Sequence, residues 1–192
     1  MGKGEWHKKR RKRNQVQMRI PTSPPNFQLV KLKYCENFVF TLNNTLPMVN
    51  RVFRINDLYD PNYTSTGHQP YFRDQMYQLY TRARVLSSKI SVQFAPNTNQ
   101  AIDCVLCPVS DGAVDTDFTL SRERKGCKGR ICNLGALGWL SAVSSTSKAL
   151  GVSSLAVKTD DKFIQYANNA LDNSVANWWQ VGCNLMDPAG VS

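Results

Sequence analysis

The chain has 192 residues, 42% of them hydrophobic, and a formal net charge of +10 at pH 7. This length and composition predict one domain with a full hydrophobic core. No run of residues is long and apolar enough for a membrane span or a secretory signal, so we expect no membrane insertion.

The first nineteen residues carry most of the charge. They hold eight basic residues and one acidic residue, a net charge of +7, which leaves +3 for the rest of the chain. A dense cationic segment with few apolar side chains is expected to be disordered alone and to bind a polyanion, because neutralised phosphates release counterions. The predicted nucleic-acid-binding residues are Lys3, Lys8, Lys9, Arg10, Arg11, Lys12, Arg13 and Arg19.

The unbroken basic run also has the composition of a nuclear localisation signal. Its residues are Lys8, Lys9, Arg10, Arg11, Lys12 and Arg13. An anionic membrane surface and a solvated tail without a role are the alternatives. The run has no interleaved apolar face for an interfacial helix, so we favour nucleic acid as the partner and nuclear import as a second use of the same residues.

Prolines at 21, 24 and 25 separate this arm from the remainder. We therefore expect residues 1–25 to form a basic arm with a linker and residues 26–192 to form the folded domain. Alternating apolar side chains predict strands over residues 27–34, 38–42, 49–55, 85–94, 101–109 and 175–186. Weaker strands or loops are predicted over 128–134, 135–147 and 153–158.

Helical signals are few. A helix of about two turns is expected over residues 71–81, with Phe72, Met76, Leu79 and Tyr80 on its apolar face, and a short helix or excursion over 159–166. Residues 57–70 form a long polar loop. Many short strands with hardly any helix predict an all-β sandwich, barrel or jelly roll with antiparallel pairing.

The cysteines and histidines offer little chemistry. Cys104 with Cys107, and Cys127 with Cys132, loosely resemble a zinc ribbon. In a strand, however, a separation of three sends Cys104 and Cys107 to opposite faces, so we expect buried or free thiols and no metal. The two histidines, at 7 and 68, lie in the tail and in a loop, and no nucleotide or protease motif is present. We expect no enzyme and no cofactor.

Five segments carry a recognisable order and spacing. They are Lys31-Leu-Lys-Tyr34, Val52-Phe-Arg-Ile-Asn-Asp-Leu-Tyr-Asp-Pro61, Tyr63-Thr-Ser-Thr-Gly-His-Gln-Pro70, Asp74-Gln-Met-Tyr-Gln-Leu-Tyr80 and Ser88-Lys-Ile-Ser-Val-Gln-Phe94. Together they resemble the capsid proteins of circular, Rep-encoding single-stranded DNA viruses, the circovirus-like group. The match spans residues 31–94, and beyond residue 110 only the strand with Trp178 and Trp179 is similar.

The resemblance implies a structural protein, a single eight-stranded antiparallel jelly roll, sixty copies of which close into a small T=1 icosahedral capsid. The basic arm would face inward, package the viral single-stranded DNA and take the protein to the host nucleus through an import receptor before it enters the virion. Sixty such arms would concentrate about 420 net positive charges. The alternative is a non-capsid β-sandwich that binds nucleic acid through a basic tail.

The family resemblance and the polarity of residues 57–70 also suggest a role for this loop. We expect a subunit contact made by Asp57, Tyr59, Asp60, Pro61, Gly67, His68, Gln69 and Pro70. A loop satisfied within its own subunit is the alternative. Four strand residues could extend the basic inner surface or simply protect strand edges: Lys31, Lys33, Arg51 and Arg54.

The end of the chain departs from the family pattern. In the family a further strand follows the tryptophan-containing strand and closes the sheet, whereas Asp187-Pro-Ala-Gly-Val-Ser192 is typical of a turn. The last strand would then be missing, and its neighbours would have unpaired edges. A truncated reading frame, a strand supplied from elsewhere and a strand count off by one all stay open.

Overall fold

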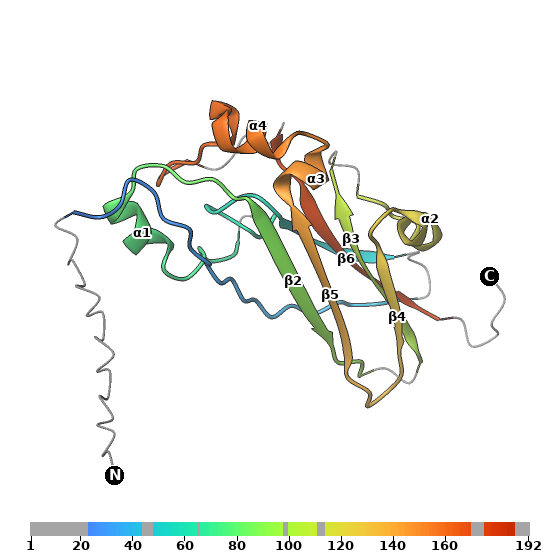
Figure 1. Cartoon of the computed structure of the whole chain (residues 1–192). Helices are drawn as coiled ribbons and strands as arrows, with labels where there is room; N and C mark the ends of the chain where they lie inside the picture. Colours follow the sequence, from blue (N-terminus) through green and yellow to red (C-terminus); the bar gives the residue numbers. More distant parts are fainter. Residues whose placement is uncertain are drawn as a thin grey trace, which may run out of the picture.

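Two antiparallel sheets and a few short helices make up the chain in the computed structural model (Figure 1), which describes residues 23–43, 48–64, 66–97, 100–110, 114–169 and 175–186. The larger sheet has the strand order β1-β6-β3-β4, and the smaller sheet pairs β2 with β5. The strands are β1 (Val49–Arg54), β2 (Ser87–Phe94), β3 (Ile102–Val109), β4 (Lys128–Cys132), β5 (Gly138–Ser145) and β6 (Trp178–Leu185).

The main core lies between the two sheets, which makes the fold a β-sandwich. Phe53, Leu106 and Trp179 of the larger sheet share one buried cluster with Val92 and Leu140 of the smaller sheet. Strands β2 and β5 alternate between buried and exposed residues, whereas β3 and β6 are buried on both faces. The difference arises because β3 and β6 are the central strands of the larger sheet, and residues outside the main core cover its second face.

The strand with the two tryptophans, β6, lies inside the larger sheet. It pairs antiparallel with β1 along one edge, from Val49 opposite Cys183 to Arg54 opposite Trp178. It pairs with β3 along its other edge over its full length. Both edges of the tryptophan-containing strand are therefore paired within the described residues, whereas residues 187–192, expected to form a turn in place of a last strand, lie outside them.

The segment 31–43 is extended but joins neither sheet. Even-numbered residues point inward, and Tyr34, Phe38, Phe40 and Leu42 pack against the main core, whereas the odd-numbered residues are exposed. One isolated bridge, between Lys33 and Tyr71, is its only ladder contact within the described residues. The predicted strands over 27–34 and 38–42 are thus wrong as sheet strands, although the predicted alternation holds from residue 31.

Short helical segments connect the strands. They are α1 (Arg73–Leu79), α2 (Phe118–Glu123), α3 (Thr146–Leu150), α4 (Ser154–Thr159) and the 3-10 turn η1 (Asp161–Phe163). Segment 153–158, predicted as a weak strand or loop, is helical because the Ser153 side chain accepts a hydrogen bond from the backbone N–H of Ala156. Within the described part of the chain, no helix is long and apolar enough to cross a membrane.

The predicted apolar face of α1 is wrong for Phe72 and Leu79, whereas its other two members, Met76 and Tyr80, are half-buried. Phe72 and Leu79 are exposed, and the most buried residue of the helix is Arg73, 2% exposed, with Met76 and Tyr77 half-buried beside it. These positions follow i, i+3 and i+4, so the helix still has one inward face. The guanidinium group of Arg73 occupies that face because hydrogen-bond acceptors and aromatic rings surround it.

The prediction for the cysteines is wrong in one respect. Cys104 and Cys107 lie on opposite faces of β3, as predicted, the first in the main core and the second in a separate cluster. Cys107, however, is disulfide-bonded to Cys127 rather than a free thiol. Since Leu106 pairs with Lys128 in the β3–β4 ladder, Cys107 and Cys127 are the next facing pair, with Cα atoms 4.1 Å apart. Free thiols remain at Cys35, Cys104, Cys132 and Cys183.

Candidate nucleic-acid interface and subunit contact

The basic arm lies outside the described residues. All eight predicted nucleic-acid-binding residues and the six-residue localisation run fall within residues 1–22. Both assignments therefore remain predictions based on charge.

The loop over 57–70 folds back along the outer edge of β1. The backbone N–H of Arg54 donates to the carbonyl oxygen of Pro61 at 2.7 Å, and the N–H of Tyr63 donates to Val52 at 3.2 Å. The carboxylates of Asp57 and Asp60 accept hydrogen bonds from backbone N–H groups two residues further on. The carboxylate bonds form local turns, and the two backbone bonds join the loop to β1, so the loop covers a strand edge of its own subunit.

Buried amides fasten the start of this loop to distant parts of the chain. The Gln165 side chain donates to the carbonyl oxygen of Asn56 at 2.6 Å and accepts from the backbone N–H of Leu58 at 2.7 Å. The Asn56 side chain donates to the carbonyl of Val175 and accepts from the N–H of Asn177. The loop base, the segment after η1 and the start of β6 are thereby held together.

A carboxylate from the unpaired segment secures the middle of the loop. Glu36 accepts a hydrogen bond of 2.5 Å from the Tyr34 hydroxyl and two bonds, of 2.9 and 3.0 Å, from the amide of Asn62, which is fully buried. Burial, followed by the bond to Glu36, raises the pKa of Tyr34 well above its usual range. A side chain at Gly67 would collide with the Tyr34 hydroxyl, so the close approach requires glycine.

His68 bridges the loop and the unpaired segment. Its Nδ1 lies 2.8 Å from the carbonyl oxygen of Gln69 and its Nε2 lies 2.8 Å from the carbonyl oxygen of Cys35. Its ring also lies against Tyr34, with the centroids 4.7 Å apart. Both partners are acceptors, so only the doubly protonated imidazolium satisfies both. The two backbone hydrogen bonds, that to Gln69 first, raise the pKa of His68.

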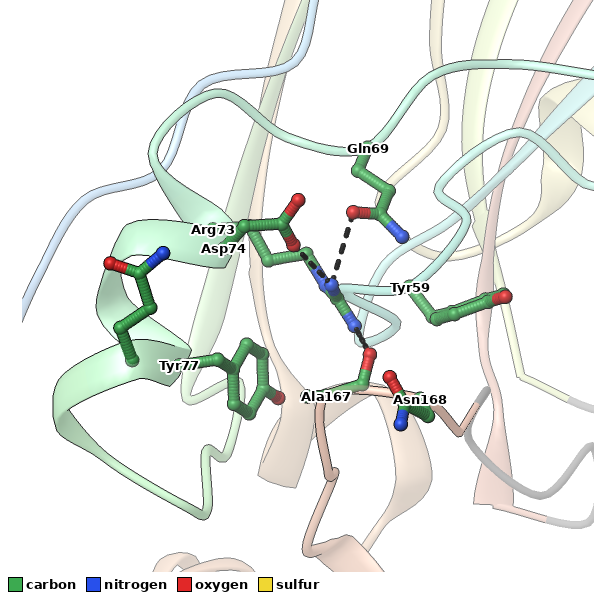
Figure 2. A pocket seen from close by; sticks show the side chains of 8 residues that line it. Tyr59, Gln69, Arg73, Asp74, Tyr77, Ala167 and Asn168 are labelled. Carbon is green, nitrogen blue, oxygen red and sulfur yellow. Dashed lines mark hydrogen bonds and ion pairs between the residues drawn. The ribbon is translucent and has the colours of Figure 1, made fainter.

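Arg73 forms the floor of an open pocket of about 410 Å³ (Figure 2). Its guanidinium donates to Gln69 at 3.0 Å, to Asp74 at 2.7 Å and to the carbonyl oxygen of Ala167. The rings of Tyr59 and Tyr77 lie 5.3 and 4.7 Å from its charge centre. Because these partners already engage the guanidinium, we assign Arg73 to holding α1, the loop and the segment after η1 together.

The predicted subunit-contact residues divide by exposure. Asp57, Pro61 and Pro70 are buried within their own chain, Asp60 and Gln69 are half-buried, and Tyr59, Gly67 and His68 are exposed. A contact with a second subunit would therefore use the exposed three. Glu36, Asn62 and Arg73, which hold the loop in place, were missed by the sequence analysis. For Arg73 the available signal was its i, i+3, i+4 spacing to Met76 and Tyr77.

The four strand residues proposed for the inner surface differ in availability. Lys31 and Lys33 are exposed. Arg51 is half-buried with its charge centre 5.9 Å from the ring of Phe38, and Arg54 forms an ion pair of 3.3 Å with Asp57. Only the two lysines therefore present their charge to a partner.

Within the described residues, no group of three or more His, Cys, Asp or Glu side chains is arranged to hold a metal ion. No protein-family model and no curated protein matches the chain.

Proposed function

We propose that this chain is the capsid protein of a circovirus-like virus, a subunit that assembles into a small icosahedral shell and packages single-stranded DNA through its basic arm. The observation that carries the proposal is the separation of charge, +7 in residues 1–19 against +3 in all the others. Such a division suits a folded domain that forms the shell and a basic arm that releases counterions from nucleic acid on binding. Neutralisation of phosphates does not require recognition of a base sequence.

The strand order supports a jelly roll. An eight-stranded jelly roll interleaves two sheets, with its first, eighth, third and sixth strands in one and its second and seventh adjacent in the other. The order β1-β6-β3-β4 with β2-β5 has this arrangement if the fourth and fifth strands are missing between β3 and β4. In that interval the chain has helix α2 (Phe118–Glu123). On this interpretation β6 is the last strand of the jelly roll.

Electron microscopy and light scattering of the purified chain test the proposal. We expect closed particles of uniform size with a high ratio of absorbance at 260 to 280 nm. A full-length variant with the six residues from Lys8 to Arg13 replaced by glutamine should lose the nucleic acid. Monomers or dimers that bind DNA only in low salt would instead support the non-capsid β-sandwich with a nucleic-acid-binding tail.

Nuclear import by the same run is tested separately. A fluorescent fusion of the full chain should accumulate in the nucleus of cultured cells, and the glutamine variant should not. Equal distribution of both fusions would contradict the localisation role and leave the packaging role standing.

A further inference from the structure

The outer face of the β2–β5 sheet combines an exposed aromatic ring with positive charge. Side chains that point away from the core form three facing pairs across the two strands: Gln93 with Trp139, Ser91 with Ser141 and Lys89 with Val143. Trp139 is 55% exposed and Val143 is 69% exposed. The opposite faces of both strands are buried in the main core, so this outer face is held rigidly.

Two basic side chains of β4 extend this face at the free edge of β5. The Lys128 ammonium donates to the carbonyl oxygen of Ser141 at 2.6 Å, which leaves two of its hydrogens for another acceptor. The Arg130 side chain passes beside Gly138, next to Trp139 in the chain. Figure 1 shows β2, β5 and β4 lying side by side, and β4 is the edge strand of the larger sheet, paired with β3.

None of this charge is neutralised in place. Strands β2, β4 and β5 contain no aspartate or glutamate. Within the described residues, Lys89, Lys128 and Arg130 form no ion pair, whereas Arg122 and Arg124 nearby in the chain are paired with Asp103 and Asp115. The face therefore has three available cations around one tryptophan.

We propose that this surface, formed by Lys89, Gln93, Lys128, Arg130, Trp139 and Ser141, is a second site for single-stranded nucleic acid. A base stacks on the indole of Trp139, and the flanking phosphates contact the three cations. Surfaces that bind single strands without sequence preference combine an aromatic platform with cations along the backbone path. This inference rests on the proposed function, since it assigns the same ligand to the folded domain as well as to the arm.

A subunit interface is the rival occupant of the same surface. The buried centre of a protein interface is depleted in charged residues such as lysine, and the two exposed apolar side chains of the facing pairs, Trp139 and Val143, are separated by Ser141 and so offer little contiguous apolar area. The composition therefore favours a polyanion. An interface at this face becomes one outcome of the test.

The test separates base stacking from charge. The basic arm can neutralise phosphates whether or not bases are present, whereas stacking on Trp139 requires bases. Binding of the full chain to a fluorescent twenty-residue oligothymidine is compared with an abasic oligonucleotide of equal length. We expect Trp139→Ala to weaken oligothymidine binding about 5- to 160-fold and to leave abasic binding unchanged. Trp6→Ala, in the arm, is the matched control for stacking by another tryptophan.

Charge is tested by a matched pair of double variants. Lys128→Gln with Arg130→Gln should reduce the slope of log affinity against log salt by about 1.4, because each lost phosphate contact on a single strand contributes about 0.7. Lys148→Gln with Lys158→Gln removes the same charge from exposed positions in α3 and α4. A smaller reduction is expected from this control pair, and equal reductions would contradict the site.

The remaining outcomes are distinguishable. If Trp139→Ala binds both oligonucleotides as wild type does, or if only Trp6→Ala removes the preference for bases, the platform is overturned while the arm's role stands. If Trp139→Ala loses particles but not base-dependent binding, the face is a subunit interface and the inference is wrong. If the wild-type chain forms no particles yet shows the Trp139-dependent preference, the capsid proposal fails and the site remains.

Discussion

His68 joins two segments that are far apart in the sequence, with its Nε2 atom 2.8 Å from the carbonyl oxygen of Cys35. Its other ring nitrogen lies at the same distance from the carbonyl oxygen of Gln69. A neutral imidazole has one donor nitrogen and can satisfy only one of these acceptors, so the geometry selects the protonated ring. Glu36, which contributes to the raised pKa of His68, favours the same form.

We predict that this clamp weakens as the pH rises. Because the folded state raises the pKa of His68 above 6.5, its contribution to stability is full below that value and is lost as the pH rises through the folded-state pKa. The chain has only two histidines, so an NMR titration of the ring protons should resolve His68 and show its raised pKa.

A comparison of variants completes this experiment. The stability difference between wild type and His68→Gln should be largest at low pH and should shrink towards alkaline pH, whereas His7→Gln should change nothing. A His68 pKa at or below 6.5 in the folded chain would contradict the clamp, as would a stability difference that does not vary with pH.

The next prediction concerns Arg73 and depends on the shape of its guanidinium group rather than on its charge. Its guanidinium bonds Gln69, Asp74 and a backbone carbonyl in three directions, which the ammonium of lysine cannot reproduce from the same position. Arg73→Lys should therefore lower the free energy of unfolding by about 1–3 kcal/mol in urea denaturation. The exposed Arg82→Lys is the control and should change stability by less than about 0.5 kcal/mol. Equal effects at the two positions would show that Arg73 does not hold the pocket together.

Substitution of Asn62 tests the contribution of its buried hydrogen bonds to Glu36. Asn62→Asp replaces two donated bonds with a second carboxylate facing the first, so we expect a loss of at least about 1–3 kcal/mol at neutral pH. Protonation of one carboxyl would restore a donor, and thus the loss should diminish in acid. Thermal melts at several pH values measure this loss of stability. Asn62→Ala is the control, because its loss of stability should not diminish in acid. A pH-independent loss for Asn62→Asp would argue against the pair.

The spacing of apolar residues predicted two kinds of strand: strands with one apolar and one polar face, and strands that are apolar along their whole length. Strand β2 was clear because Ile90, Val92 and Phe94 alternate with polar residues. Strand β5 was only a weak candidate because serines occupy both of its faces, including the buried Ser144. The segment 31–43 has the alternation of a strand, but pairing depends on where a partner edge lies, which no local pattern encodes.

The candidate site was harder to predict for a related reason. The family resemblance and the polarity of residues 57–70 selected this loop, yet the side chains that hold it come from elsewhere in the chain, from Glu36 and Gln165. A buried arginine such as Arg73 is also unlike the usual pattern, since burial of its charge is tolerable only with acceptors from other segments. The exposed Trp139 could not be separated from core tryptophans until the face of β5 was known.

The Cys107–Cys127 disulfide predicts a stability that depends on reduction. The bond closes a loop with a sequence separation of 20 residues, which in the chain-entropy account is worth about 3 kcal/mol. Reductant should lower the unfolding midpoint of the wild-type chain and of the Cys35→Ala control equally. A Cys107→Ala, Cys127→Ala variant should already be destabilised and should not respond to reductant.

Thiol counting distinguishes this outcome from the simpler expectation of six free cysteines. Alkylation of the unfolded, unreduced chain should label Cys35, Cys104, Cys132 and Cys183 and leave the other two unmodified until reductant is added. Labelling of all six without reductant would show that the facing cysteines stay reduced. The pairing of β3 with β4 would then rest on its ladder hydrogen bonds and the packing of Cys132 in the main core, while the Asp103–Arg122 ion pair joins β3 to α2.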